Sequence, residues 1–210
     1  MNQPSIVIVD YGIGNVHSVS SAILSLDYRR VKISKHAKDI LDADVLVLPG
    51  VGAFEACIKN LCAYHLDEIL NESVLVLQKP ILGICVGMQL MADISEENGF
   101  HTGLGWIPGR VVKLDLPKPY LVPHVGWNNV RIIQSSPLFS SIDKDCHFYF
   151  DHSYYYQCDQ RYVTAACDYS HLVTASISHK NIYGVQFHPE KSHTNGLKLF
   201  RSFFNAVGQC

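Results

Sequence analysis

One cysteine of this sequence lies in a motif that could make its thiol a nucleophile. Cys85 is the centre of the segment GICVG, residues 83–87, which has the pattern of a nucleophile elbow with sulfur in place of oxygen. An apolar run precedes the segment and a helical pattern follows it, so the glycines allow a sharp strand-to-helix turn. The N-terminus of that helix would favour the thiolate form of Cys85. Taken alone, the segment fits a buried structural cysteine about equally well.

A base and an acid that could serve this cysteine stand near the other end of the chain. His188 and Glu190 flank Pro189, just after an expected strand. In extended backbone, residues i and i+2 point the same way, and Pro189 favours an extended residue before it. The Glu190 carboxylate can therefore hold the His188 ring in one tautomer and stabilise its imidazolium form. Together with Cys85, this pair predicts a Cys-His-Glu triad.

Backbone amides near the expected nucleophile could stabilise a negatively charged oxygen. The segment PGVG, residues 49–52, ends an apolar run and leaves N–H groups free to face a ligand. The N–H groups of Val51 and Val86 could together form an oxyanion hole. Without the triad, the same segment would be interpreted as an ordinary glycine turn.

The hydrophobic pattern supplies a framework that can bring these segments together. The first half alternates short buried strands with helical patterns, which is typical of a mainly parallel, doubly wound α/β sheet. The second half has short strands rich in β-branched and aromatic residues, which indicates an antiparallel extension. The expected strands are 5–9, 31–34, 44–48, 80–84, 111–116, 129–133, 146–150, 154–157, 162–166, 173–178 and 182–187. The expected helices are 15–26, with Asn15 as a possible cap, 53–75, 87–93 and 194–206. Neither a linker nor a repeat interrupts the pattern, and we expect a single domain over residues 1–210.

Composition excludes several classes of protein. The chain has 210 residues, 48% hydrophobic and 17% charged, with a net charge of -2, which is typical of a globular protein. It has no long basic run, so we expect no nucleic-acid partner. Seven cysteines without a C-x-x-C pair argue against a disulfide framework and favour a reducing compartment. We expect no signal peptide, no contact with a membrane and a cytoplasmic location.

Two weaker patterns suggest a cofactor or a metal. Gly12 and Gly14 follow a strand as in a dinucleotide-binding loop, but the third glycine of that motif is missing. His124, His152 and His193 could bind a metal, but their spacing matches no common metal motif. We therefore expect neither a cofactor nor a metal.

Taken together, the motifs resemble the class I, or triad, glutamine amidotransferase family. The resemblance rests on GICVGMQ at 83–89 and QFHPEKS at 186–192. It also rests on DYGIGN at 10–15, LPGVGAF at 48–54, PHVGWN at 123–128 and HSY at 152–154, all in the family's order. It covers essentially the whole chain and implies the class I amidotransferase fold. It also implies that L-glutamine is the substrate and that Cys85 forms a γ-glutamyl thioester and releases ammonia. His188 would then be the base and Glu190 its orienting acid.

The resemblance extends to the surroundings of the triad and to a partner. It assigns the oxyanion donors to Val51 and Val86, and the glutamine site to Gly50, Gly52, Gln89, Glu97, His152, Ser153 and Tyr154. Asn15, Trp127 and Lys191 match positions that face a synthase subunit. In the family that partner is a (β/α)8 barrel cyclase, which forms a heterodimer with the glutaminase and receives its ammonia. Chemistry supports a separate acceptor subunit, because ammonia released into water at pH 7 becomes ammonium, which is not a nucleophile.

Several alternatives stay open. Asp151 stands where the family usually has an apolar residue, either near the glutamine site or turned outward by strand alternation. The segments GWI at 105–107 and KSH at 191–193 are similar to a branch that supplies ammonia for amidino sugars rather than for histidine biosynthesis. A stand-alone Cys-His hydrolase would have no use for the partner-facing motifs. A non-catalytic module would usually lack one residue of the triad.

Overall fold

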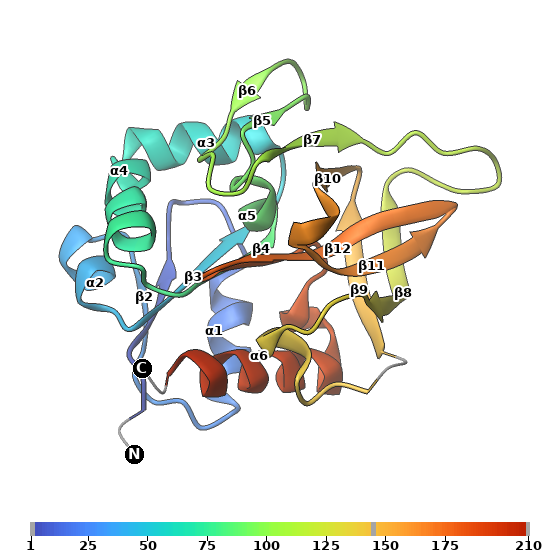
Figure 1. The fold of residues 1–210 in the computed structure, drawn as a ribbon. Helices are drawn as coiled ribbons and strands as arrows, with labels where there is room; N and C mark the ends of the chain where they lie inside the picture. The colour runs from blue at the N-terminus through green and yellow to red at the C-terminus, as the bar shows by residue number, and fades with distance from the viewer. Residues whose placement is uncertain (1–2, 144–145, 209–210) are drawn as a thin grey trace.

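The computed structural model describes residues 3–143 and 146–208, and this part of the chain has the predicted α/β architecture (Figure 1). Its larger sheet has nine strands, in the order β2 (Val31–Ser34), β1 (Ile6–Val9), β3 (Val45–Gly50), β4 (Ile81–Cys85), β13 (Ile182–Val185), β12 (His171–His179), β11 (Val163–Tyr169), β8 (His124–Ile132) and β9 (Cys146–His152). The strands from β2 to β13 in this order pair in parallel. Those from β13 to β9 pair antiparallel. The prediction of a parallel sheet with an antiparallel extension is therefore confirmed.

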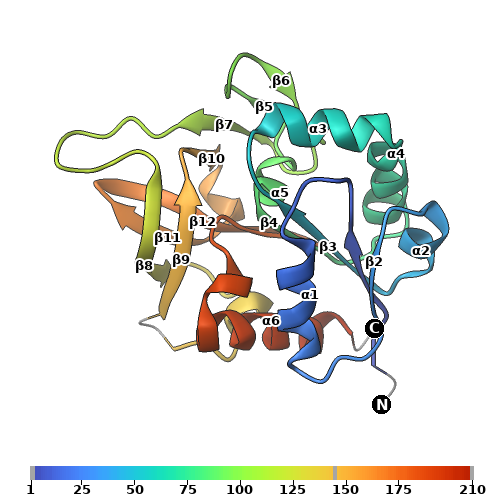
Figure 2. The ribbon, with the colours of Figure 1, turned by 180° about the vertical axis from the view of Figure 1, so that it is seen from behind.

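A smaller sheet lies beside the larger one. Its strands follow the order β10 (Tyr154–Cys158), β7 (Gly109–Lys113), β5 (Ile94–Ser95) and β6 (His101–Thr102). The chain between β7 and β8 projects away from both sheets in two opposite views (Figures 1 and 2). This projecting segment leads directly into β8, whose first residues belong to the PHVGWN motif.

Helices cover both faces of the parallel part of the sheet. The main helices are α1 (Val16–Leu24), α2 (Ala37–Asp42), α3 (Phe54–Ala63), α4 (Leu66–Asn71), α5 (Val86–Gln89) and α6 (His193–Val207). α3, α4 and α5 lie on one face, and α1 and α6 lie on the other (Figure 2). Because both faces are covered, every residue of β1, β3 and β4 is buried, which explains their uninterrupted apolar runs. No helix among the described residues is long and apolar enough to cross a membrane.

Some predicted boundaries were wrong, for local reasons. The helix expected over 53–75 is interrupted, because His65 adopts a left-handed conformation with φ of +55° between α3 and α4. Residues Glu72–Val76 then form a π-helical turn. β8 starts at His124, well before the expected strand at 129–133. Its Pro- and Gly-containing start looks like a turn in the sequence, but it pairs with β9 from His124 opposite His152 onward. Tertiary pairing thus overrides local propensity.

The thiols agree with the expectation of unpaired cysteines. Cys57, Cys62, Cys85, Cys158 and Cys167 are free. The Cys146 thiol donates to the Val130 carbonyl across the β8–β9 pair at 3.3 Å. Cys210 lies outside the described residues.

Candidate active site

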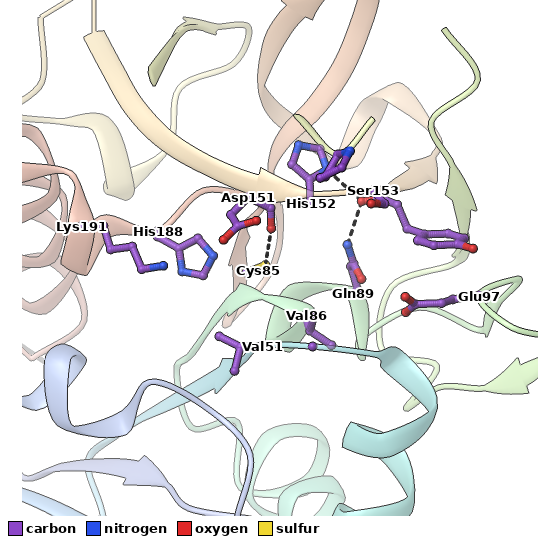
Figure 3. A pocket seen from close by; sticks show the side chains of 13 residues that line it. Val51, Cys85, Val86, Gln89, Glu97, Asp151, His152, Ser153, His188 and Lys191 are labelled. Carbon is purple, nitrogen blue, oxygen red and sulfur yellow. Dashed lines mark hydrogen bonds between the residues drawn. The ribbon is translucent and has the colours of Figure 1, made fainter. Parts of the chain in front are cut away.

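A pocket of about 280 Å³ opens beside the carboxyl ends of β3, β4 and β9 (Figure 3). This is the edge at which open α/β sheets usually bind ligands. The structure brings most of the predicted site residues into its wall: Val51, Gly52, Cys85, Val86, Gln89, Glu97, His152, Ser153, Tyr154, His188 and Lys191. Pro123 and Asp151, which were not predicted as site residues, complete the lining.

Cys85 occupies a strained turn between β4 and α5. Its φ of +55° and ψ of −112° lie in a region that L-residues rarely adopt, at a cost of about 1–3 kcal/mol. The packing around the turn leaves no room for relaxation, since a Cβ on Gly87 would lie 1.8 Å from the Leu48 carbonyl oxygen. The local geometry is therefore that of the predicted elbow. The helix that follows is shorter than the predicted 87–93, because α5 ends at Gln89.

His188 and Glu190 form a buried pair next to this elbow. His188 Nδ1 and Glu190 Oε1 are 2.9 Å apart, and the two side chains are 3% and 1% exposed. His188 is extended, as predicted, and Glu190 follows in a 3-10 turn over Pro189–Lys191. Burial by itself lowers the pKa of His188, but its hydrogen bonds with Cys85 and Glu190 outweigh burial and raise that pKa to about 10. The site thus favours an imidazolium beside the sulfur.

Asn15 is the residue that precedes α1, and its side chain reaches the candidate triad. It occupies the expected cap position, but its side chain makes no capping hydrogen bond. Its Nδ2 instead faces the Glu190 carboxylate oxygen Oε1 at 3.5 Å, as a donor. This long contact links the DYGIGN motif to the acid of the candidate triad.

Two hydrogen bonds to backbone carbonyls fix the segment that carries Val51, the predicted oxyanion donor. The Tyr11 hydroxyl donates to the Pro49 carbonyl at 2.8 Å, and the Cys57 thiol donates to the Val51 carbonyl at 3.5 Å. Burial raises the pKa of the Cys57 thiol to about 11, so the thiol keeps its proton and remains a donor. The Gly50–Val51 peptide, which carries the Val51 N–H, lies between these two fixed points.

A buried series of hydrogen bonds joins β8 to the pocket wall. His152 Nδ1 donates to the Tyr154 carbonyl at 2.9 Å, because a carbonyl can only accept. His152 Nε2 then accepts from His124 Nδ1 at 3.0 Å, and His124 Nε2 accepts from Asn128 Nδ2 at 3.3 Å. Burial lowers the pKa of His152 to about 3 and that of His124 to about 4. Both rings are therefore neutral at pH 7, and each has one defined tautomer.

We expect this neutral pair to make the fold less stable in mild acid. An unfolded histidine has a pKa of about 6.5, whereas the folded pair takes up protons only near pH 4 and pH 3. Between these values the unfolded chain binds more protons than the folded chain, so the free energy of unfolding falls as the pH falls below about 6.5. Urea unfolding between pH 7 and pH 5 measures this slope. His124→Asn should make the slope shallower, and His17→Asn, at an exposed histidine, should not. If the free energy of unfolding of His124→Asn depends on pH as steeply as that of the parent, the two histidines are not a neutral pair.

The remaining polar groups of the pocket lie around its other walls. Gln89 is buried, and its amide nitrogen donates to the Tyr154 carbonyl at 2.9 Å. Glu97 Oε2 accepts from the backbone N–H of Phe54 at 2.7 Å, and its carboxylate points toward Gln89 (Figure 3). Asp151, whose direction the sequence left open, places its side chain in the pocket between those of His188 and His152 (Figure 3).

The other predicted residues lie around the pocket. Gly50 is buried in β3 opposite Cys85. Trp127 is 47% exposed on β8 and stacks on the His193 ring, with ring centres 5.1 Å apart. Lys191 lines the pocket while its side chain also contacts the face of the Tyr149 ring. In the described part of the chain, no group of three or more His, Cys, Asp or Glu side chains could hold a metal ion.

A doubly wound sheet with a cysteine in a strained turn, beside a buried histidine–glutamate pair, is the arrangement of enzymes that use a cysteine nucleophile. The family model described as glutamine amidotransferase class-I matches residues 7–207. This chain therefore belongs to the class-I glutamine amidotransferase family, which is a family of enzymes.

Individual relatives extend the likeness over nearly the whole chain. An imidazole glycerol phosphate synthase subunit HisH 2 of Vibrio vulnificus is 45% identical over 202 residues, which cover 96% of this chain and 94% of that protein. A subunit HisH of Listeria monocytogenes is 43% identical and covers 98% of this chain and 97% of that protein. The structure of PurLQS from Thermotoga maritima superposes with a TM-score of 0.75 at 16% identity, covering 98% of this chain and 100% of that one. At that identity, the likeness shows the fold alone.

Proposed function

We propose that this chain is the glutaminase subunit of an imidazole glycerol phosphate synthase, working in the cytoplasm. It hydrolyses L-glutamine to glutamate and ammonia and passes the ammonia to a cyclase subunit. That subunit uses it to form imidazole glycerol phosphate and AICAR in histidine biosynthesis. The observation that carries the chemistry is the 2.9 Å bond between His188 and Glu190 beside Cys85, inside a pocket of amino-acid size. The names of the relatives support the acceptor reaction.

In the first half of the proposed reaction, the Cys85 sulfur attacks the side-chain amide carbon of glutamine. The amide oxygen gains negative charge, which the N–H groups of Val51 and Val86 stabilise. The His188 imidazolium gives its proton to the amide nitrogen, the C–N bond breaks, and ammonia leaves. Cys85 now carries a γ-glutamyl thioester, and His188 is neutral.

In the second half, water replaces ammonia and the same groups act in reverse. Neutral His188 takes a proton from the water as its oxygen attacks the thioester carbon. The C–S bond then breaks, which releases glutamate and restores the thiolate and the imidazolium. Glu190 holds the Nδ1 hydrogen of His188 throughout, so that Nε2 always faces the reacting atoms.

Glutamine is held by other groups in and around the pocket. We assign this role to Gly50, Gly52, Gln89, Glu97, His152, Ser153 and Tyr154, as the sequence motifs indicate. The Glu97 carboxylate has the charge that a substrate ammonium group requires. It is held in place by the Phe54 N–H. Asp151 adds a second negative charge to the wall of the pocket.

The cyclase partner is proposed to be a (β/α)8 barrel that forms a heterodimer over the mouth of this pocket. The projecting segment and β8 carry exposed large hydrophobic residues there: Tyr120, Leu121, Val122, Val125 and Trp127. Pro123, in the middle of this stretch, lines the pocket. An apolar stretch at the rim of an active site suits a docked protein. With Lys191, and with Asn15 at the triad, it makes up the proposed interface.

The proposal is tested by measuring glutamate release by the chain alone and with a barrel cyclase subunit and its ligand. We expect slow hydrolysis by the chain alone and fast hydrolysis in the complex. A free glutaminase would waste glutamine, and the Gly50–Val51 peptide could supply the control by turning its N–H into or out of the oxyanion hole. One missing oxyanion donor costs about 10²–10³ in rate. If the isolated chain is as fast as the complex, this control is wrong. If neither releases glutamate, the function is wrong.

Trp127→Ala should weaken the stimulation by the partner. The ring is half-exposed and stacked on His193 at the rim, outside the pocket lining, so its loss removes docking surface and leaves the reacting groups in place. The rate of glutamate release is measured at increasing concentrations of the cyclase subunit. We expect the variant to be stimulated less than the parent, and to hydrolyse glutamine at nearly the parent rate when the cyclase subunit is absent. Val76→Ala, at a residue 73% exposed beyond α4, is the matched control and should behave as the parent. An unchanged titration curve in Trp127→Ala would exclude Trp127 from the interface.

A second acceptor pathway, amidino-sugar synthesis, has one observation in its favour. The KSH segment places His193 against Trp127 on the proposed interface, and this segment differs from the common histidine-branch form. Expressing the chain in a bacterium that lacks its own histidine-branch glutaminase subunit separates the two pathways. Growth without histidine supports the first proposal, and failure to grow despite glutaminase activity with another barrel synthase supports the second.

A further inference from the structure

Gln186 touches the candidate nucleophile from below the pocket. Its side-chain nitrogen Nε2 lies 3.7 Å from Cys85 Sγ, a normal distance for an N–H···S hydrogen bond. Gln186 is completely buried and does not line the pocket, so it approaches the sulfur from the protein interior. It follows β13, whose last residue, Val185, pairs with Ile84, the residue before Cys85 on the parallel strand β4. The contact is thus made where these two paired strands of the central sheet end.

Neighbouring groups fix which end of the Gln186 amide faces the sulfur. The Tyr154 carbonyl can only accept, so the nitrogen of Gln89 must face it, at 2.9 Å. The same nitrogen lies 3.0 Å from the Gln186 side chain, which must therefore present its oxygen there. The other end of the Gln186 amide, its nitrogen, is left for Cys85. Because the Tyr154 carbonyl also accepts from His152, the orientation is anchored in the pocket wall.

We propose that Gln186 is a further catalytic residue, which donates a hydrogen bond to the Cys85 sulfur and stabilises it as a thiolate. The inference rests on the proposed function, in which this sulfur attacks glutamine and is later expelled. His188 reaches the sulfur as a cation that gives its proton away during the reaction. The Gln186 amide cannot ionise, so it keeps donating in both halves of the reaction. It therefore favours the thiolate before attack and as the leaving group in hydrolysis.

The same contact connects substrate binding with the nucleophile. Gln89 lies in the pocket wall and also fixes the Gln186 amide, so it is one hydrogen bond away from the group that touches the sulfur. A ligand that moves the Gln89 side chain would also move the donor on Cys85. Gln186 stands two residues before His188, in the bend that follows β13. That spacing was the available sequence signal, and it was missed.

The test measures the reactivity of Cys85 separately from glutamine hydrolysis. The full chain is alkylated with iodoacetamide across a range of pH, and modification of the Cys85 peptide is followed by mass spectrometry. Gln186→Met removes the donor at similar volume, and Gln186→Leu removes it with a branched side chain; neither adds a charge beside Cys85. Both should move the half-maximal alkylation of Cys85 upward by about one pH unit, as expected for a hydrogen bond to a charged group. In the complex with the cyclase subunit, kcat for glutamine should fall about tenfold or more with little change in KM.

Thr164→Val is the matched control. Its hydroxyl donates to Ser176 at 2.8 Å, so this variant loses a buried hydrogen bond of the same sheet without a recorded contact to Cys85. Its alkylation profile should match that of the parent. If Gln186→Met does not fold, Gln186→Leu carries the test.

Each outcome separates this inference from the proposed function. A parent-like alkylation profile in a folded Gln186 variant, or an equal shift in Thr164→Val, overturns the role of Gln186 while leaving the glutaminase proposal intact. A shifted profile in a chain that never hydrolyses glutamine supports the role of Gln186 and overturns only the proposed function.

Discussion

Cys85→Ala is expected to abolish glutamine hydrolysis and to spare synthesis from added ammonium salts. In the proposed reaction the sulfur forms the bond to the substrate, and alanine has no atom that can replace it. Ammonia supplied from solution bypasses the thioester and reaches the cyclase subunit directly. The substituted side chain is small and the turn is fixed by Gly87 and β3, so we expect the fold and the complex to survive.

The measurement is made on the complex, with glutamate release and product formation followed in the same sample. Cys62→Ser is the matched control, because Cys62 is an exposed free thiol on α3 and should be dispensable. Glutamine hydrolysis that persists in Cys85→Ala would remove this residue from the mechanism. Loss of the ammonium-dependent reaction as well would point to a damaged complex.

His188→Ala is expected to have the second largest effect, and a larger one than Glu190→Gln. His188 moves a proton in each half of the reaction, and such general acid–base catalysis contributes about 10²–10⁴ in rate. Glu190 only orients and polarises the ring through the 2.9 Å bond to Nδ1, and a glutamine amide can keep part of that contact. The rate of glutamate release in the complex at saturating glutamine measures both losses. If His188→Ala releases glutamate as fast as the parent, His188 has no part in the mechanism. A greater loss of rate in Glu190→Gln than in His188→Ala would contradict the roles proposed for the two residues.

The central part of the fold could be predicted because its sequence signals are local. β1, β3 and β4 are buried on both faces, so each reads as a continuous apolar run in the sequence. The elbow at Cys85 requires small residues at fixed positions, which makes it visible as a pattern. His188 and Glu190 were recognised through their two-residue spacing around Pro189.

The features that were missed depend on contacts between distant segments. Asn15 stands before α1 as expected of a cap, but its side chain faces a carboxylate that is far away in the sequence. β8 was placed too late, because only its pairing with β9 shows that the segment before Asn129 is extended. The Asp151 side chain points into the pocket because the end of β9 lies beside Cys85. The local sequence around Asp151 carries no sign of that position. A glutamine side chain neither ionises nor acts as a nucleophile, so Gln186 does not stand out in the sequence. Its proposed role follows only from the orientation that Gln89 imposes on its amide.

The central claim is that Cys85 carries the glutamyl group during turnover, and one measurement tests it directly. The chain in complex with its cyclase subunit is quenched with acid while it turns over L-glutamine, digested, and analysed by mass spectrometry. We predict that the peptide containing Cys85 gains the mass of one glutamyl group, that the adduct disappears when glutamine is exhausted, and that Cys85→Ala never forms it. Release of glutamate by the parent without any adduct on Cys85, or a glutamyl group on another residue of the parent, would contradict the account.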